Sequence, residues 1–190
     1  PGTGGPSPVR VGAYCIDSTE VTNAHFAAYL ADAKPRERGP DCESAVLEAA
    51  AFPGANDLPV VRVGWCAAFA FCKWAGKRLC ASNQWFNACS ANGTKKYPYG
   101  DTFQADACNV GDKPIRAVGT TPGCVGGTPG LFDMSGNVAE WEDACTGDEC
   151  LIRGAGADED DPTEVTCATD EKHETKAKQD AFVGFRCCSP

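Results

Sequence analysis

The sequence predicts an α+β fold with little regular secondary structure, and three observations support this class. Helical periodicity is confined to three short segments in the first half of the chain. From Ser90 onward Gly, Pro, Asn and Asp recur at short intervals, which indicates long loops and short strands. Thirteen cysteines among 190 residues indicate that disulfide bridges, more than regular structure, hold these loops.

The chain is expected to contain one domain preceded by a short linker. Residues 1–8 are rich in Gly and Pro and are interpreted as the end of a flexible linker. Residues 9–190 are long enough to fold as a single domain with its own hydrophobic core. Val9 to Asp17 is interpreted as the first strand of that domain.

Three helices are expected to follow. Thr22 or Asn23 can cap the first, because apolar residues recur at helical spacing after them. Trp65 to Ala75 is apolar nearly all round, which is typical of a buried central helix, and Gly76 can end it. Ser82 can cap a third, shorter helix.

Composition and charge exclude several classes of function. A hydrophobic content of 43% with 23% charged residues is not that of a disordered chain. The net charge of −9 argues against nucleic acid or an anionic membrane surface as partner, since phosphate binding needs clustered Lys and Arg. No apolar run approaches the roughly 20 residues of a membrane-spanning helix.

The cysteines indicate an oxidising compartment. Only two histidines are present and no Cys-x-x-Cys pair occurs, so a zinc site is not expected. Disulfides then explain the cysteine content, which predicts an extracellular, periplasmic or cell-surface location. The odd number leaves one free thiol or one bridge to another chain.

The segment from Gly130 to Trp141 contains the most informative chemistry. It is a glycine-broken turn with acidic and amide side chains at tight spacing. Such a turn can bind a hard cation through Asp133, Glu140 and the carbonyls that glycine leaves accessible. The alternative is a surface turn beside a core tryptophan.

This turn, Gly-Leu-Phe-Asp-Met-Ser-Gly-Asn-Val-Ala-Glu-Trp, resembles the signature of the formylglycine-generating enzyme (sulfatase-modifying factor) family. The resemblance covers roughly residues 9–190 and implies a variant of the C-type-lectin-like fold and a bacterial source. Further blocks resemble the family in the same order: Ile16-Asp17 with Glu20 to Asn23, Pro59 to Leu79, Tyr97 to Asp101, Arg153-Gly154, and Gly184 to Cys187.

The resemblance implies two calcium positions. At the first, structural Ca²⁺ would be bound by the Asp133 and Glu140 side chains and by the Gly136 and Val138 carbonyls, completed by water. The second is placed at Asn109 and Val110, and its remaining ligands cannot be assigned from this sequence.

The resemblance also implies a disulfide scheme. The two recurrent bridges of the family map by position onto Cys72–Cys187 and Cys89–Cys167. The additional cysteines suggest four more bridges and leave Cys15 unpaired. These are Cys80–Cys188, Cys108–Cys124, Cys145–Cys150 and Cys42–Cys66.

The copper-binding cysteine pair of the family's oxidases is absent. In those enzymes the pair follows an Arg-Gly-Gly-Ser block, which reads Arg153-Gly154-Ala155-Gly156 here, and counting onward reaches Glu159 and Glu164. No cysteine lies between Cys150 and Cys167, so the soft thiolates that Cu(I) requires are missing. No copper is expected. Cys145 and Cys150 precede the block and are interpreted as a local disulfide.

The sequence therefore favours a secreted or surface-exposed module without catalytic residues, used for binding a protein partner or for self-assembly. Two alternatives stay open. One is a formylglycine-generating oxidase that acts on a sulfatase cysteine. The other is a carbohydrate-binding module that uses lectin-like loops to bind glycan.

Other charged and aromatic groups have structural interpretations. Arg78 is expected to anchor a loop through a buried ion pair, with Glu20 or Glu140 as partner. The acidic run over residues 158–161 is interpreted as a solvated loop. The four tryptophans are interpreted as core residues.

Overall fold

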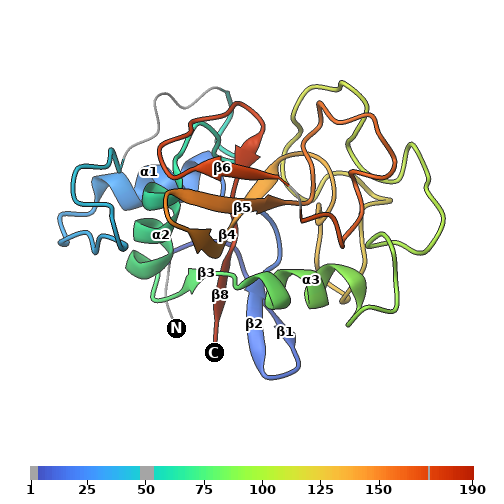
Figure 1. The fold of residues 1–190 in the computed structure, drawn as a ribbon, viewed down its shortest axis with the longest axis horizontal. Coiled ribbons are helices and arrows are strands. Elements are labelled where there is room, and N and C mark those ends of the chain that lie inside the picture. The colour runs from blue at the N-terminus through green and yellow to red at the C-terminus, as the bar shows by residue number, and fades with distance from the viewer. Residues whose placement is uncertain (1–3, 48–53, 171) are drawn as a thin grey trace.

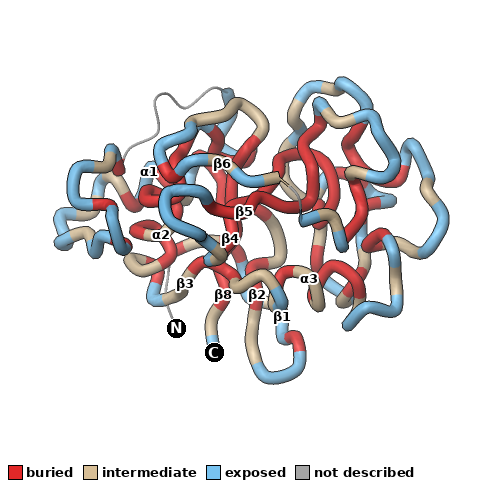
Figure 2. The backbone as a smooth tube through the Cα atoms, viewed as in Figure 1, coloured by how far each residue is buried: buried red, intermediate tan, exposed pale blue. Residues whose placement is uncertain are grey.

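The computed structural model describes residues 4–47, 54–170 and 172–190. Figure 1 shows two helices on one side of the molecule and long loops on the other, with two small sheets between them. Figure 2 shows buried backbone in α2 (Trp65–Trp74) and the central strands and also in the inner parts of the long loops. The expected class, α+β with few regular elements, is confirmed.

Each of the three helices begins close to where the sequence places it. In the first helix, α1 (Asn23–Ala31), the Thr22 hydroxyl accepts the backbone N–H of His25, so Thr22 is the N-cap. The second, α2 (Trp65–Trp74), is buried over most of its length, and Gly76 follows it with φ 71°.

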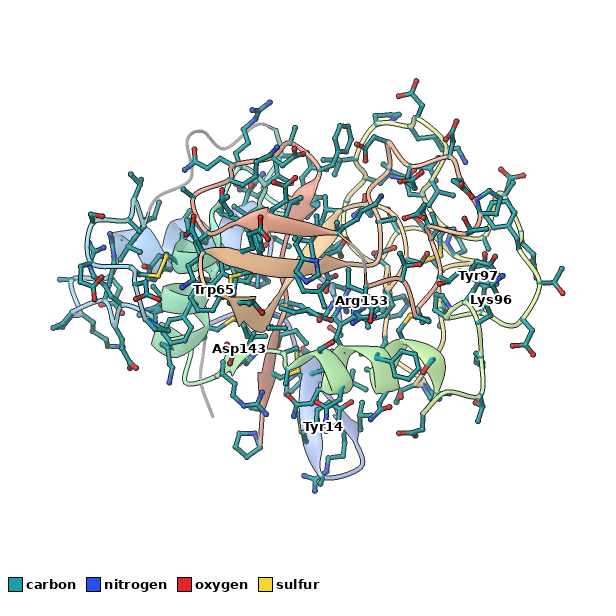
Figure 3. The ribbon with its side chains drawn as sticks, in the orientation of Figure 1. Tyr14, Trp65, Lys96, Tyr97, Asp143 and Arg153 are labelled. Atoms are coloured by element: carbon teal, nitrogen blue, oxygen red, sulfur yellow. A yellow bond between two sulfur atoms is a disulfide. The ribbon has the colours of Figure 1, made fainter. Side chains whose placement is uncertain are left out.

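The third helix, α3 (Ser82–Ser90), differs in its cap. Ala81 occupies the N-cap position, and the Gln84 side chain accepts its N–H. The Ser82 hydroxyl accepts instead a hydrogen bond of 2.7 Å from Nη2 of Arg153. Figure 3 labels this arginine. Ser82 does not cap the helix because a buried guanidinium uses its oxygen.

One four-stranded sheet joins the two ends of the chain. The expected strand over residues 9–17 is a hairpin, since Gly12 turns the chain with φ 58°. The C-terminal strand pairs with the second strand of the hairpin and with a two-residue strand after α2. Its order is β1 (Pro8–Val11), β2 (Tyr14–Asp17), β8 (Cys187–Ser189), β3 (Arg78–Leu79).

The signature turn leads into the second sheet, at the start of the inner strand β4 (Ala139–Thr146). The two longest strands of this sheet form an antiparallel pair, and the short strand before the C-terminus pairs with the first of them in parallel. Its order is β6 (His173–Thr175), β5 (Glu149–Arg153), β4 (Ala139–Thr146), β7 (Val183–Gly184). Because β7 and β8 are nearly consecutive, Arg186 lies where the chain passes from one sheet to the other.

Residues 4–8, which were expected to belong to a flexible linker, pack against the domain. Gly4 lies against the Trp74 ring so closely that a Cβ atom would come within 2.3 Å of it. The Pro6 carbonyl accepts a hydrogen bond of 3.1 Å from Lys77 Nζ. The absence of a side chain at Gly4 permits this approach. Residues 1–3 lie outside the described part of the chain.

Twelve of the thirteen cysteines form six disulfides, and Cys15 on β2 is free and partly exposed. Cys72–Cys187 and Cys80–Cys188 tie α2 and its following strand to the C-terminus. The pairs are those that the sequence suggested: Cys42–Cys66, Cys72–Cys187, Cys80–Cys188, Cys89–Cys167, Cys108–Cys124 and Cys145–Cys150.

The tryptophans lie in the core, as expected. Trp65, Trp85 and Trp141 are each 1% exposed, and Trp74 packs against the main aromatic cluster of α1 and α2. No helix in the described ranges is long and apolar enough to cross a membrane.

Candidate functional site

The signature turn is a strained loop held by backbone hydrogen bonds. Asp133 and Asn137 have φ of 54° and 64°, a region that Asp and Asn tolerate better than most residues. Gly136 lies so close to the Asn109 carbonyl that a Cβ atom would come within 2.5 Å of it. The Gly136 N–H donates to Gly154 at 2.7 Å. These contacts define the shape of the turn.

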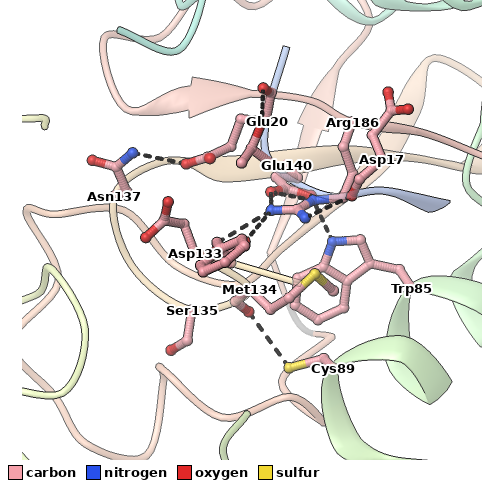
Figure 4. A network of polar contacts seen from close by, with 12 residues as sticks. Asp17, Glu20, Trp85, Cys89, Asp133, Met134, Ser135, Asn137, Glu140 and Arg186 are labelled. Atoms are coloured by element: carbon pink, nitrogen blue, oxygen red, sulfur yellow. Dashed lines mark hydrogen bonds and ion pairs between the residues drawn. The ribbon is translucent and has the colours of Figure 1, made fainter. Parts of the chain in front are cut away.

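Three buried carboxylates lie near one guanidinium beneath this turn, and Glu140 pairs with it directly (Figure 4). Glu20, Asp133, Glu140 and Arg186 form what we call the carboxylate–arginine cluster, and none of them is more than 2% exposed. Arg186 donates to both Glu140 oxygens, with Nε at 2.9 and 2.7 Å and Nη2 at 2.7 Å. Trp85 Nε1 donates to Glu140 at 2.7 Å, which completes the environment of that carboxylate.

The other two carboxylates are less well compensated. The Asp133 side chain accepts the Gly119 N–H at 2.5 Å. Glu20 Oε1 accepts from Asn137 Nδ2 at 2.8 Å, while its Oε2 is buried with no hydrogen-bond partner. A buried oxygen without a hydrogen-bond partner destabilises the fold, so a proton or a cation at Glu20 Oε2 would be stabilising.

The pKa values follow from this imbalance. Burial raises the pKa of Glu20 well above its ordinary value, and the charges of Asp133 and Glu140 raise it further, against the lowering effect of Arg186. Burial also raises the pKa of Asp133 to about 6. Three ionised carboxylates and one guanidinium would leave the cluster with two uncompensated negative charges, the charge that one divalent cation neutralises.

The donor chemistry of the turn fits calcium at Asp133 and the two carbonyls. All donors are oxygens, as calcium prefers, and the surplus negative charge of the cluster favours a divalent ion. Glu140 differs from the expectation, because both its oxygens already accept from Arg186 and Trp85. It can contribute only by sharing its carboxylate between the ion and Arg186.

The second expected calcium position has fewer donors. The Asn109 side chain donates to Pro114 at 3.0 Å and to Asn137 at 3.2 Å, and its own oxygen is buried without a partner. Val110 packs beside Tyr97 in a small apolar cluster.

Across the described ranges, no group of three or more His, Cys, Asp or Glu side chains is placed to hold a metal ion.

The two positions that the resemblance assigns to copper cysteines lie on either side of one lysine. Lys172 Nζ is hydrogen bonded to Glu159 Oε2 and lies 3.9 Å from Glu164 Oε2. Burial alone would raise the pKa of Glu159, but the hydrogen bonds from Lys172 and from the Asp160 and Asp161 amides lower it below its ordinary value. An ammonium group thus joins these two carboxylates.

A cavity of about 120 Å³ lies next to this lysine. Ala139, Gly156 and Phe182 contribute to its walls, and Asp158 and Lys172 contribute charge. No cysteine is among its lining residues.

The ion pair that the sequence suggested for Arg78 is not formed. Arg78 donates to the Gln84 side chain at 2.5 Å, so its partner is neither Glu20 nor Glu140. Arg186 pairs with Glu140 instead. Lys77 forms the buried ion pair of this region, with Asp17.

Sequence reasoning missed Arg186 and Lys172 as organising residues. Arg186 belongs to the Gly184 to Cys187 block, and an arginine inside this block of the core would need a carboxylate partner. Lys172 has no local sequence signal, because it reaches Glu159 from a separate loop.

Comparison with known proteins agrees with this architecture. Residues 3–189 match the model of the sulfatase-modifying factor enzyme 1-like domain. An inactive C-alpha-formylglycine-generating enzyme 2 from Bos taurus is 32% identical over 154 residues, which cover 70% of this chain and 50% of that protein. A formylglycine-generating enzyme from Thermomonospora curvata is 29% identical over 190 residues, which cover 74% of this chain and 62% of that protein.

The fold also matches a solved structure. PvdO from Pseudomonas aeruginosa superposes with a TM-score of 0.70 at 18% identity, covering 93% of this chain and 80% of that chain. This chain spans about half or less of the length of the first curated relatives it matches.

Proposed function

Since the chain belongs to the sulfatase-modifying factor enzyme 1-like domain family, we propose that it is a non-catalytic member that serves as a binding or assembly module. Its binding partner is proposed to be another protein or a second copy of itself. Disulfides and a structural calcium ion are proposed to make the module rigid, which suits recognition by surface loops.

The observation that carries the proposal is the pairing of Glu159 and Glu164 with Lys172. The resemblance assigns those two positions to the thiolates that hold copper in the oxidases. Carboxylates are hard ligands and suit Cu(I) poorly, and the ammonium group of Lys172 repels any cation placed between them. A metal centre that activates oxygen has no suitable ligands there.

The relatives are compatible with this proposal without deciding it. The family contains proteins named as inactive and proteins named as formylglycine-generating enzymes at similar identity. The matched region covers only part of the length of these relatives. The non-catalytic function is therefore proposed for this domain, and its partner is proposed as well. We propose that the surface of this domain binds the partner.

The six disulfides indicate an oxidising compartment. We propose an extracellular, periplasmic or cell-surface location on that basis. A carbohydrate-binding role is less favoured, because Trp65, Trp85 and Trp141 are buried and offer no stacking surface to a sugar.

Calcium is proposed to bind at Asp133 with the Gly136 and Val138 carbonyls, where it would neutralise the carboxylate–arginine cluster. It should raise the melting temperature, because it binds only the folded chain. Scanning calorimetry in calcium and in EDTA measures this increase for the wild type, for Asp133→Asn, and for Asp106→Asn as an exposed control. An equal increase in all three would place calcium elsewhere.

Sedimentation velocity over a range of concentrations tests self-assembly directly. We expect concentration-dependent association that persists in the Cys15→Ser variant if the domain surface carries it. Association lost in that variant would assign it to a Cys15 disulfide. A strictly monomeric protein would remove self-assembly and leave only a heterologous partner.

A further inference from the structure

A second, larger cavity lies away from the carboxylate–arginine cluster. It has a volume of about 230 Å³ and is formed by residues 58–62, 114–115 and 181–182. Backbone hydrogen bonds fix its walls: Val60 donates to Val21 at 2.9 Å, and Arg62 donates to Asp180 at 2.9 Å. Since backbone hydrogen bonds to segments far away in the sequence hold these walls, the cavity is preformed. We call it the Arg62 pocket.

The walls of the Arg62 pocket are apolar except for one cation. Leu58, Val61, Ile115 and Phe182 supply hydrocarbon, and the prolines of the same segments have no N–H to donate. Arg62 is exposed, and its guanidinium forms no ion pair or hydrogen bond with any described residue. The pocket therefore combines apolar walls with an uncompensated positive charge.

The backbone at Arg62 is also unusual. Its φ is 57°, in the left-handed region that residues with a Cβ atom seldom adopt. Such conformations persist where the surrounding structure fixes them, often at sites of binding. Here the Arg62 N–H donates to the Asp180 carbonyl, so the fold fixes the backbone from which the arginine side chain extends at the pocket.

The size of the pocket indicates what it can receive. Small-molecule sites usually have volumes of about 300–1,000 Å³, and this pocket is smaller. Its volume suits a single bulky side chain of a larger partner. Binding energy at protein interfaces is concentrated in such anchors, which fill desolvated pockets at the centre of the contact.

We propose that the Arg62 pocket receives a bulky apolar side chain of a protein segment that carries a carboxylate next to this anchor. The carboxylate pairs with the guanidinium of Arg62. This inference rests on the proposed function as a binding module and names the chemistry of its partner. Arg116, which directly follows Ile115 and has no ion-pair partner among described residues, adds to the local positive charge.

The net charge of −9 does not prevent an acidic segment from binding here. At physiological ionic strength charges more than about 8 Å apart are largely screened, so the nearest groups decide the interaction. Among the residues that line the pocket, Arg62 is the one that carries a charge. Repulsion from the rest of the surface lowers the association rate more than it changes the bound contact.

Fluorescence polarisation with labelled, amidated hexapeptides tests the proposal. The probes are Gly-Ser-Phe-Glu-Gly-Ser, the same peptide with Gln or Lys in place of Glu, and the same peptide with Ala in place of Phe. We expect the Phe-Glu peptide to bind at least about tenfold more tightly than the other three. Equal binding of the Ala-Glu peptide would overturn the proposal, because the pocket would then have no part in it.

Charge reversal provides the second arm. Arg62→Glu should lose about tenfold in affinity for the Phe-Glu peptide and gain affinity for the Phe-Lys peptide. Arg10→Glu makes the same change of charge at an exposed position on β1 and should alter neither affinity. Identical effects of both substitutions would reduce the interaction to general electrostatics and contradict a specific site.

A variant in which the pocket is filled distinguishes peptide binding at the Arg62 pocket from the proposed function as a binding or assembly module. Ala181→Trp places an indole at the pocket wall and should abolish binding of the Phe-Glu peptide while the melting temperature is retained. Sedimentation velocity on the same variant then reports on assembly. Assembly without peptide binding by the wild type would overturn the pocket and leave the module function standing.

Discussion

Replacing Arg186 by Met should destabilise the protein more than any other removal of a single cation. Arg186 donates to both oxygens of Glu140 and also to the Asp17 carbonyl at 3.1 Å and the Phe132 carbonyl at 3.0 Å. Methionine fills part of the volume but donates no hydrogen bond. Glu140 would then lose its guanidinium partner, and Glu20 and Asp133 would lose a positive charge close to them.

The expected loss can be worked out from the burial of the pair. Removing one partner of a buried ion pair costs about 3–5 kcal/mol. With roughly 2.1 cal/mol/K per residue, a chain of 190 residues unfolds with an entropy of about 0.4 kcal/mol/K. The melting temperature should therefore fall by about 8–12 °C. Scanning calorimetry at pH 7 in EDTA measures this shift.

Lys73→Met is the matched control. Lys73 lies 3.5 Å from Glu37, and their side chains are 35% and 63% exposed, so this pair contributes about 0–1 kcal/mol. The control should therefore melt within about 2 °C of the wild type. The effect of Arg186→Met should also be smaller at pH 5, because burial raises the pKa of Asp133 to about 6 and that of Glu20 well above its ordinary value, so both are protonated there. A shift of less than about 2 °C at pH 7, or an equal shift at both pH values, would refute this view of the cluster.

Two further predictions concern bridges and protons. The Cys72–Cys187 disulfide joins residues 115 apart in the sequence, and replacing both by Ala should reduce the free energy of unfolding by about 5 kcal/mol through loop entropy. The same change at Cys145 and Cys150, which are 5 apart, should reduce it by about 2 kcal/mol. Equal urea midpoints for the two variants would contradict the loop argument. Because burial raises the pKa of Asp133 to about 6, its protonated form stabilises the fold below pH 4, and this contribution is lost as the pH rises to about 7. In EDTA, the free energy of unfolding of the wild type minus that of Asp133→Asn should fall by up to about 3 kcal/mol between about pH 4 and pH 7. A rise in this difference would contradict a raised pKa for Asp133.

Local signals were sufficient for the helices and for the signature turn. The Thr22 cap and the apolar run over Trp65 to Ala75 act through neighbouring residues, so the sequence predicts α1 and α2 closely. The positive φ values of Asp133 and Gly136 agree with residue types that tolerate them. These features depend on contacts within a few residues.

Pairings between distant segments could not be predicted in the same way. Arg186 and Arg78 both follow apolar blocks, and only the fold decides that Arg186 reaches Glu140 while Arg78 reaches Gln84. Ser82 shows the same limit, because a guanidinium from β5 takes the hydroxyl that a cap would use. Buried ionic partners are chosen by tertiary geometry, which leaves no period in the sequence.

The split of the first strand has a different cause. A single glycine inside an apolar stretch is compatible with a continuous strand or with a turn. The turn is favoured because β2 must lie between β1 and β8, and Gly12 can adopt the positive φ that a tight hairpin requires. Pairing with the C-terminal strand therefore determines the outcome.

The absence of oxidase chemistry is tested most directly by product formation. The protein is incubated with Cu(I), oxygen, a reductant and a sulfatase-type Cys-x-Pro-x-Arg peptide, with an active formylglycine-generating enzyme as positive control. Mass spectrometry then measures conversion of the peptide cysteine to formylglycine. We expect no conversion, because Glu159 and Glu164 are joined by Lys172 and offer no thiolate to copper. Conversion of the peptide by the wild-type protein would contradict the non-catalytic function.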